Sequence, residues 1–220
     1  MAQVSELRSV TMADRLAGLM AADGSAHRAH VPGRAEADHA DAARALADAV
    51  HYLSMLHARH PGVIDLAALR PGAEGIRLWF EQASRGFDIE RLYLTRLMVA
   101  AGPVPATPGQ GAADAAVAGQ RGAIELLARS DRAGCAIGAA LALVYDWHAI
   151  RPLLDAAAMR FDVALQPQRL PDMDATLAAA EAAVVTPAME RAILFGAGQL
   201  AAQHRHLWDL LDTRRSVRQQ

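Results

Sequence analysis

Residues 134–145 read Gly-Cys-Ala-Ile-Gly-Ala-Ala-Leu-Ala-Leu-Val-Tyr, a stretch that contains neither charge nor proline. Alanine and leucine favour helix, and a helix that is apolar on all sides is typical of a protein interior. Gly134 and Gly138 are four residues apart and share one helix face, on which another backbone can approach closely. The stretch therefore predicts a buried central helix in an all-α protein.

The rest of the chain supplies helices that can cover this central one. Alanine accounts for 51 of the 220 residues, and no segment shows a sustained alternation of period two, as a strand would. Pro61-Gly62 is expected to end one helix, Pro152 to kink or end another, and Thr186-Pro187 to start the last. The predicted helices are 5–22, 36–60, 72–101, 111–150, 153–161, 174–185 and 187–215.

The length fits one domain over residues 1–220, with an N-terminal helix and loop in 1–34 and a bundle core in 35–216. The segment 102–111 contains three prolines and is either a turn or a linker between domains. A single domain is favoured, because the helices on both sides of this segment have apolar stripes that must be covered.

The composition excludes several classes of function. The formal charge of −2 is spread along the chain without a basic stripe, so no nucleic-acid partner is expected. The chain contains no lysine, which rules out a Schiff-base nucleophile, and Cys135 is alone, which rules out an intrachain disulfide. With neither a signal peptide nor a membrane span in the sequence, we expect a cytoplasmic location and no membrane partner.

Residues 196–201, Gly-Ala-Gly-Gln-Leu-Ala, match a dinucleotide-binding fingerprint. That fingerprint needs a second strand and an acidic residue about twenty positions later, but only nineteen residues follow. The apolar residues keep helical spacing through both glycines. We therefore interpret them as a small-residue face for helix packing.

A few acids and histidines interrupt the apolar faces of the long helices. His39 and His57 lie on the stripe of 36–60, Glu90 on that of 72–101, and His204 on that of the last helix, while Glu125 lies within 111–150. Four long helices that each contribute an inward acid or histidine are the framework of a di-metal carboxylate site.

This pattern resembles the ferritin-like superfamily, and Glu36-Ala-Asp-His39 supplies one Glu-x-x-His. The resemblance implies an up-down bundle of four long helices plus shorter accessory helices. In the metal-binding members it also implies two irons held by Glu-x-x-His on two helices. No other glutamate here is followed by histidine at the third position, so the duplicated motif is absent.

The heights of these residues along the bundle axis decide which of them could bind one metal ion together. If 36–60 and 72–101 are antiparallel about the 61–72 loop, Glu90 lies about 20 Å from His57 at a rise of ~1.5 Å per residue. The matched set for a metal ion is then His39, Glu90 and Glu125. No cofactor is predicted, and iron or haem is the alternative.

Two classes of function follow. The first is a binding or structural module without catalytic residues, whose small-residue faces serve internal packing or a homodimer. The second is an enzyme or carrier with a small-molecule, metal or haem pocket between the helices; in helix number and central glycines the chain is similar to the haem-oxygenase-like fold. Neither the ligand nor a catalytic residue follows from the sequence.

Overall fold

The structure, a computed structural model, describes residues 10–28 and 40–220. Within these ranges all regular structure is helical, which confirms the predicted all-α class. No helix in the same ranges is long and apolar enough to cross a membrane. The elements are α1 (Met12–Asp23), η1 (Ser25–His27), α3 (Ala40–His57), α4 (Val63–Ala67), η2 (Glu74–Ile76), α5 (Arg77–Ala101), α6 (Gln110–Ala128), α7 (Cys135–Arg160), α8 (Met173–Ala182) and α9 (Pro187–Arg218).

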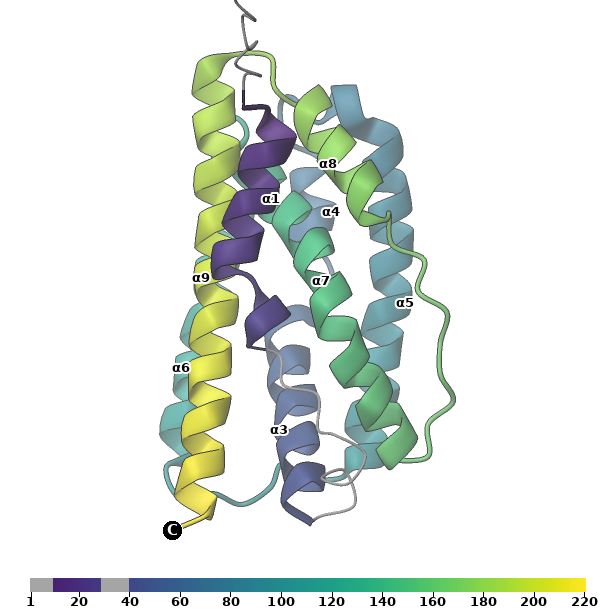
Figure 1. The fold of residues 1–220 in the computed structure, drawn as a ribbon, viewed down its shortest axis with the longest axis vertical. Helices are drawn as coiled ribbons and strands as arrows, with labels where there is room; N and C mark the ends of the chain where they lie inside the picture. Colours follow the sequence, from purple (N-terminus) through teal and green to yellow (C-terminus); the bar gives the residue numbers. More distant parts are fainter. Residues whose placement is uncertain (1–9, 29–39) are drawn as a thin grey trace, which may run out of the picture.

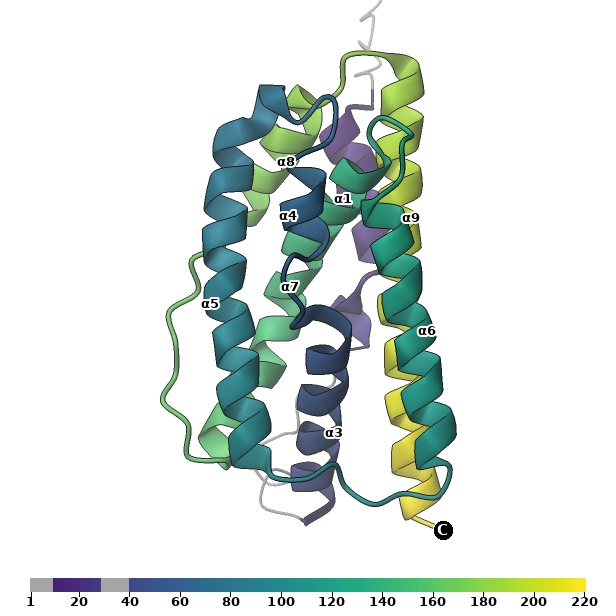
Figure 2. The ribbon, with the colours of Figure 1, turned by 180° about the vertical axis from the view of Figure 1, so that it is seen from behind.

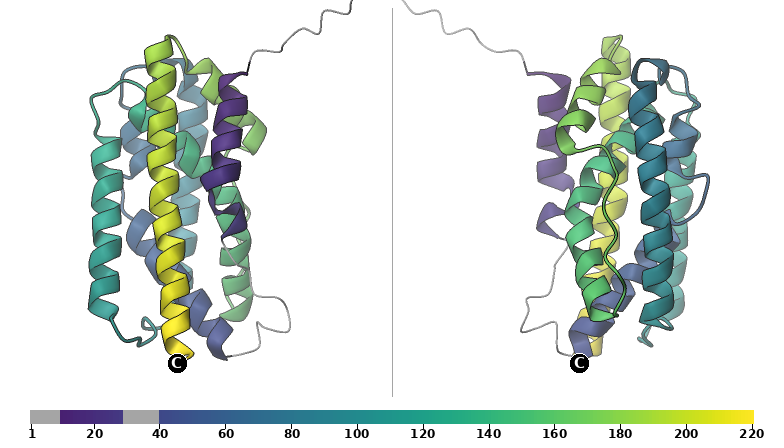
Figure 3. Two further views of the ribbon diagram at one scale, coloured as in Figure 1. Left: turned by 60° about the vertical axis from the view of Figure 1, so that its left-hand side comes forward. Right: turned by 90° about the vertical axis from the view of Figure 1, so that its right-hand side faces the viewer.

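Helix α7 is the centre of the molecule, as the stretch 134–145 predicts. It contacts α3, α4, α5, α6, α8 and α9, and every side chain from Cys135 to Val144 is buried. Helices α7 and α9 run side by side in the same direction, with α1 over them on one face (Figure 1) and α3, α4 and α6 on the opposite face (Figure 2). Helix α5 and the extended segment between α7 and α8 form one side of the bundle (Figure 3).

Two predicted boundaries around α7 are wrong. The predicted continuous helix 111–150 is broken between Ala128 and Cys135, because Gly134 adopts a left-handed conformation with φ 96° and turns the chain. The predicted end of this helix at 150 is also wrong, because α7 continues through Pro152 to Arg160. Residues after Pro152, including Leu154 and Ala157, are fully buried, and this burial outweighs the roughly 3 kcal/mol that an internal proline costs a helix.

Other boundaries follow the local sequence. Thr186 caps α9 by accepting a hydrogen bond from the backbone N–H of Met189, and Pro187 takes the first helical position, as predicted. The connection from α5 to α6 is held against α9, since Arg214 donates to the carbonyl of Pro105 (3.1 Å) and to the hydroxyl of Thr107 (3.2 Å).

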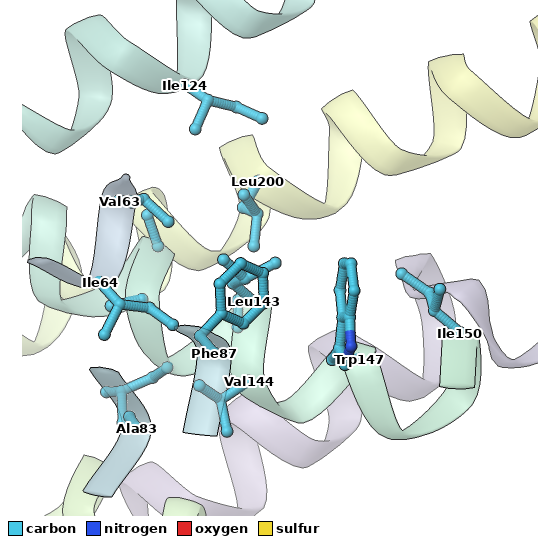
Figure 4. Packing of buried hydrophobic residues seen from close by; sticks show 14 of the residues in the cluster. Val63, Ile64, Ala83, Phe87, Ile124, Leu143, Val144, Trp147, Ile150 and Leu200 are labelled. Carbon is cyan, nitrogen blue, oxygen red and sulfur yellow. The ribbon is translucent and has the colours of Figure 1, made fainter. Parts of the chain in front are cut away.

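Glycines set the separation of α7 and α9. A Cβ atom added to Gly138 would lie 1.9 Å from the carbonyl oxygen of Ile193, and one added to Gly196 would lie 1.9 Å from that of Cys135. Gly196 lies inside α9 and not at a strand end, so the interpretation of 196–201 as a helix-packing face is confirmed. Around this contact Leu143 and Trp147 of α7 pack with Phe87 of α5 and Leu200 of α9 (Figure 4).

Candidate functional site

The apolar interior contains a continuous chain of three polar side chains, which we call the Asp–His–His chain (Asp146, His204 and His57). Asp146 accepts hydrogen bonds from the backbone N–H of Ser25 (2.7 Å), from the Ser25 hydroxyl (2.5 Å) and from Nδ1 of His204 (2.6 Å). Nε2 of His204 lies 2.8 Å from Nε2 of His57. The exposed fractions are 3% for Asp146, 0% for His204 and 6% for His57, so the chain is almost completely removed from water.

The hydrogen bonds fix where the protons of this chain lie. Burial alone would raise the pKa of Asp146, but hydrogen bonds from His204 and Ser25 hold that pKa below its usual range. An ionised carboxylate only accepts, so Nδ1 of His204 carries a proton. When His204 is neutral its Nε2 is an acceptor, and His57 donates through its own Nε2–H. Nδ1 of His57 is then left with a free lone pair.

His57 lies among aromatic rings. Its imidazole meets Trp147 edge-on with ring centroids 5.6 Å apart, and Phe87 with centroids 6.3 Å apart. Burial lowers the pKa of His57 well below its ordinary value, and the nearby His204 and Arg91 lower it further. His57 is therefore neutral near pH 7.

A second polar pair lies on the other side of Trp147. The indole N–H of Trp147 donates to Glu90 (3.0 Å), whose other oxygen accepts from Arg151 (2.6 Å). Glu90 is fully buried, and burial raises its pKa although Trp147 and Arg151 lower it. Arg151 also binds Asp155 (2.9 Å) and the carbonyl of Gln166, which ties the extended segment after α7 to the core.

The close approach of α7 and α9 brings Asp146 and His204 together. Asp146 follows Gly138 by eight residues on α7, and His204 follows Gly196 by eight residues on α9. Because the two helices run in the same direction, side chains two turns beyond the glycine contact face each other again.

Ser25 reaches Asp146 from the short helix η1. A Cβ atom on Gly24 would lie 2.7 Å from the carboxylate of Asp146, so only glycine lets the chain pass this closely. Trp208 of α9 donates to the hydroxyl of Ser25 (2.8 Å) and thereby holds η1 against the pair formed by Asp146 and His204.

His57 also lines a small cavity of about 30 Å³ between α3, α4, α5 and α6, which is room for roughly two water molecules. The ring nitrogen Nδ1 of His57 has no hydrogen-bond partner among the described residues. Apolar side chains such as Phe87 form much of the wall, and the charged lining residues are Arg59, Arg91, Arg121 and Glu125. The cavity is thus where the Asp–His–His chain meets space that protein atoms do not fill.

The structure places two of the three residues that the sequence suggested for a metal ion, Glu90 and Glu125, and does not bring them together. Glu90 binds Arg151 and Trp147 in the core, whereas Glu125 is 38% exposed and pairs with Arg59 (3.1 Å) at the surface. His39 lies outside the described residues. In the parts of the chain that the structure describes, no three His, Cys, Asp or Glu side chains are grouped so as to hold a metal ion.

The predicted distance of about 20 Å between His57 and Glu90 is wrong, because one tryptophan side chain, Trp147, contacts both. The two helices are not joined by a simple loop, since α4 and η2 lie between them and α5 extends beyond the end of α3 (Figure 2). The contacts of Trp147 with both residues put Glu90 near the last turn of α3.

Sequence reasoning missed Ser25 and gave Asp146 no role in a site. The spacing of eight residues from Gly138 to Asp146, repeated from Gly196 to His204, is the signal that could have found this pair.

A further cavity of about 50 Å³ lies between α3, α7 and α9 and is lined by Leu46, Leu153 and Trp208. Its lining also includes the charged residues Arg28, Asp48, Asp212 and Arg215.

The fold and the site together define a helical-bundle protein with a buried Asp–His–His chain that ends at a small cavity. Residues 20–219 match a protein family that is described as "Family of unknown function (DUF6975)", and the chain belongs to this family. No curated protein and no solved structure matches it.

Proposed function

We propose that the protein binds a small molecule in the His57 cavity and exchanges a proton with it through His57. One observation carries this proposal: the buried Asp–His–His chain ends at a cavity with a ring nitrogen that has no partner among the described residues. Perturbed titratable groups that line a cavity are characteristic of functional sites. The proposed binding site is therefore this cavity between the helices.

The geometry supports acid–base chemistry. A ligand proton can pass to Nδ1 of His57 while the Nε2–H of His57 passes to Nε2 of His204. The positive charge then rests on His204, 2.6 Å from the carboxylate of Asp146, which stabilises it. The described ring and hydrogen-bonding partners of His57 are His204, Trp147 and Phe87, and they include no serine, threonine or cysteine that His57 could activate. General acid–base catalysis is therefore favoured over a covalent intermediate.

A purely structural role is the second candidate. Asp146 satisfies both the backbone N–H and the hydroxyl of Ser25, and Trp208 adds a third bond to this residue. The same contacts would hold η1 against α7 and α9 without any ligand. A structural network, however, gives no reason for His57 to line a cavity with Nδ1 unpartnered.

Small probes distinguish these roles. We would titrate the full chain, labelled with ¹⁵N-histidine, with acetate, acetamide and ethylammonium, each up to about 50 mM. The proposal predicts that at least one probe shifts the Nδ1 resonance of His57, and that His57→Gln removes binding or its proton transfer. His206→Gln, at an exposed position of α9, is the control and should change neither. If none of the three probes shifts His57, the site is structural.

We propose separately that the protein is related to the ferritin-like bundles and that it associates with itself. The long helices α5, α6, α7 and α9 support the first. The second draws support from Leu78 and Val99, which are 72% and 74% exposed on α5. Light scattering at micromolar concentration tests self-association, and a monomer there would contradict it.

A further inference from the structure

Arg91 is the second residue in the His57 cavity with an unpartnered polar atom. Its side chain is 8% exposed, and its Nε has no hydrogen-bond partner. Its other two nitrogens bind Asp88 (2.6 Å) and Asp65 (2.5 Å), and its guanidinium carbon lies 5.0 Å from the centre of the Phe87 ring. These contacts fix the guanidinium in place, and the Nε–H is left without an acceptor.

The side chains of His57, from α3, and Arg91, from α5, line the same cavity, and each has one nitrogen without a hydrogen-bond partner among the described residues. A buried guanidinium N–H without an acceptor is costly, so a ligand that supplies an acceptor would be stabilised there. Such an acceptor must be small, because the cavity holds roughly two waters. The two oxygens of a carboxylate can replace those two waters.

We propose that the ligand of this site is a small organic acid whose carboxylate accepts one hydrogen bond from Nε–H of Arg91 and one from Nδ1–H of His57, and that its binding takes up one proton. This inference rests on the proposed function and names its ligand class. The remainder of the ligand would extend toward Arg59, Arg121 and Glu125, which also line the cavity.

Proton uptake follows from the hydrogen-bonding pattern. A carboxylate only accepts, so Nδ1 of His57 must carry a proton when the ligand is bound. Nε2 of neutral His57 is then an acceptor, and Nε2 of His204 must donate to it. Since Nδ1 of His204 already donates to Asp146, His204 becomes doubly protonated. The bound state therefore holds one proton more than the free state in which His57 donates.

The surrounding charges make this proton necessary. Asp65 and Asp88 already neutralise Arg91, so a bound anion would find little uncompensated positive charge in the empty site. The proton on the His57–His204 pair supplies that charge. Charged and titratable groups from every neighbouring element surround the pair: Asp146 and Arg151 from α7, Glu90, Asp88 and Arg91 from α5, Asp65 from α4, Arg121 and Glu125 from α6, and Arg59 and His60 after α3.

Calorimetry of the full chain with acetate tests this inference. The titration is carried out at about pH 7.5 in HEPES and in Tris, whose different ionisation enthalpies report the protons exchanged with the buffer. We expect close to one proton taken up per acetate. The affinity should fall by up to tenfold per pH unit as the solution becomes more basic.

Two variants separate the two hydrogen bonds. Arg91→Lys keeps a positive charge beside Asp65 and Asp88 but lacks Nε–H, and acetate affinity should fall about tenfold. His57→Gln can still donate a hydrogen bond but cannot relay a proton, so any acetate that binds should do so without proton uptake. Arg77→Lys, at an exposed position of the same helix, is the matched control and should leave the affinity unchanged.

The possible results have distinct meanings. Acetate that binds the unmodified chain without proton uptake overturns the inference, and this test needs no variant to fold. Binding of acetamide or ethylammonium but not acetate overturns the ligand class while the proposed function stands. If no probe binds, both fail.

Discussion

Replacing Gly138 with alanine tests whether the close approach of α7 and α9 builds the site. The added Cβ would lie 1.9 Å from the carbonyl oxygen of Ile193, whereas ordinary contacts begin at 3.4 Å. The helices must therefore separate by about 1.5 Å at this point, or deform by a similar amount. His204 and Asp146 lie two turns further along the same pair of helices, so the separation reaches their hydrogen bond.

The magnitude follows from the packing and from the hydrogen bond. Overpacking a close-packed interior costs about 1–3 kcal/mol, and separating two helix backbones lies at the upper end or beyond. Alanine is a better helix former than glycine by up to about 1 kcal/mol, which offsets part of that cost. We expect the free energy of unfolding to fall by about 2 kcal/mol. If α9 moves as a rigid body, the Nδ1–Oδ2 distance of 2.6 Å between His204 and Asp146 grows to about 4 Å, which breaks the bond.

Urea denaturation and NMR measure the two effects. Gly119→Ala on α6 is the control, because nothing lies within 4 Å of its added Cβ, and it should stabilise the protein by up to about 1 kcal/mol. The buried N–H of His204 should give a downfield, slowly exchanging proton signal in the unmodified chain and in Gly119→Ala, but not in Gly138→Ala. If Gly138→Ala is as stable as Gly119→Ala and keeps that signal, the glycine contact does not position the site and our reasoning is refuted.

Three further results are expected. Asp146→Asn should reverse the tautomer of His204, because the new amide N–H donates to Nδ1, and an unchanged ¹⁵N pattern would contradict the proposed proton positions. Because the pKa of His57 is lowered in the folded state, the protein should lose stability as the pH falls below about 6.5, by up to about 1.4 kcal/mol per pH unit. Urea denaturation should show this slope in the unmodified chain, and His57→Gln should remove it. Trp147→Phe removes the indole N–H that donates to Glu90, so the free energy of unfolding should fall by about 1–3 kcal/mol and the pKa of Glu90 should rise further. A ¹³C carboxyl titration that shows no upward shift of the Glu90 pKa would refute this.

The sequence predicts a helix end well where residues at that end determine it. Thr186-Pro187 starts α9 because the threonine caps the helix and the proline fits its first turn. The break before Cys135 could not be predicted, because Gly134 is as compatible with a helix face as with a left-handed turn. The continuation of α7 through Pro152 could not be predicted either, since it depends on burial that other helices provide.

The site is predictable only in part, for a related reason. Spacing along a helix shows that His57, His204 and Glu90 interrupt apolar faces, and all three are buried. Spacing does not show which faces meet. His57 and His204 are 147 residues apart, and their contact depends on how α3 and α9 are rotated and shifted against each other. The predicted heights of His57 and Glu90 along the bundle are wrong for the same reason, since α4 displaces α3 relative to α5.

The two polar groups beside Trp147 differ in what they can do chemically. Glu90 is paired with Arg151, and a guanidinium keeps its protons throughout the accessible pH range, so no proton can pass from Glu90 through this pair. Asp146 is paired with His204, whose second nitrogen can give or take a proton without breaking the bond to the carboxylate. The proton transfer that we propose is therefore confined to the Asp146–His204–His57 side, which leads to the cavity. The Glu90 pair holds the indole in place as the wall against which His57 is oriented.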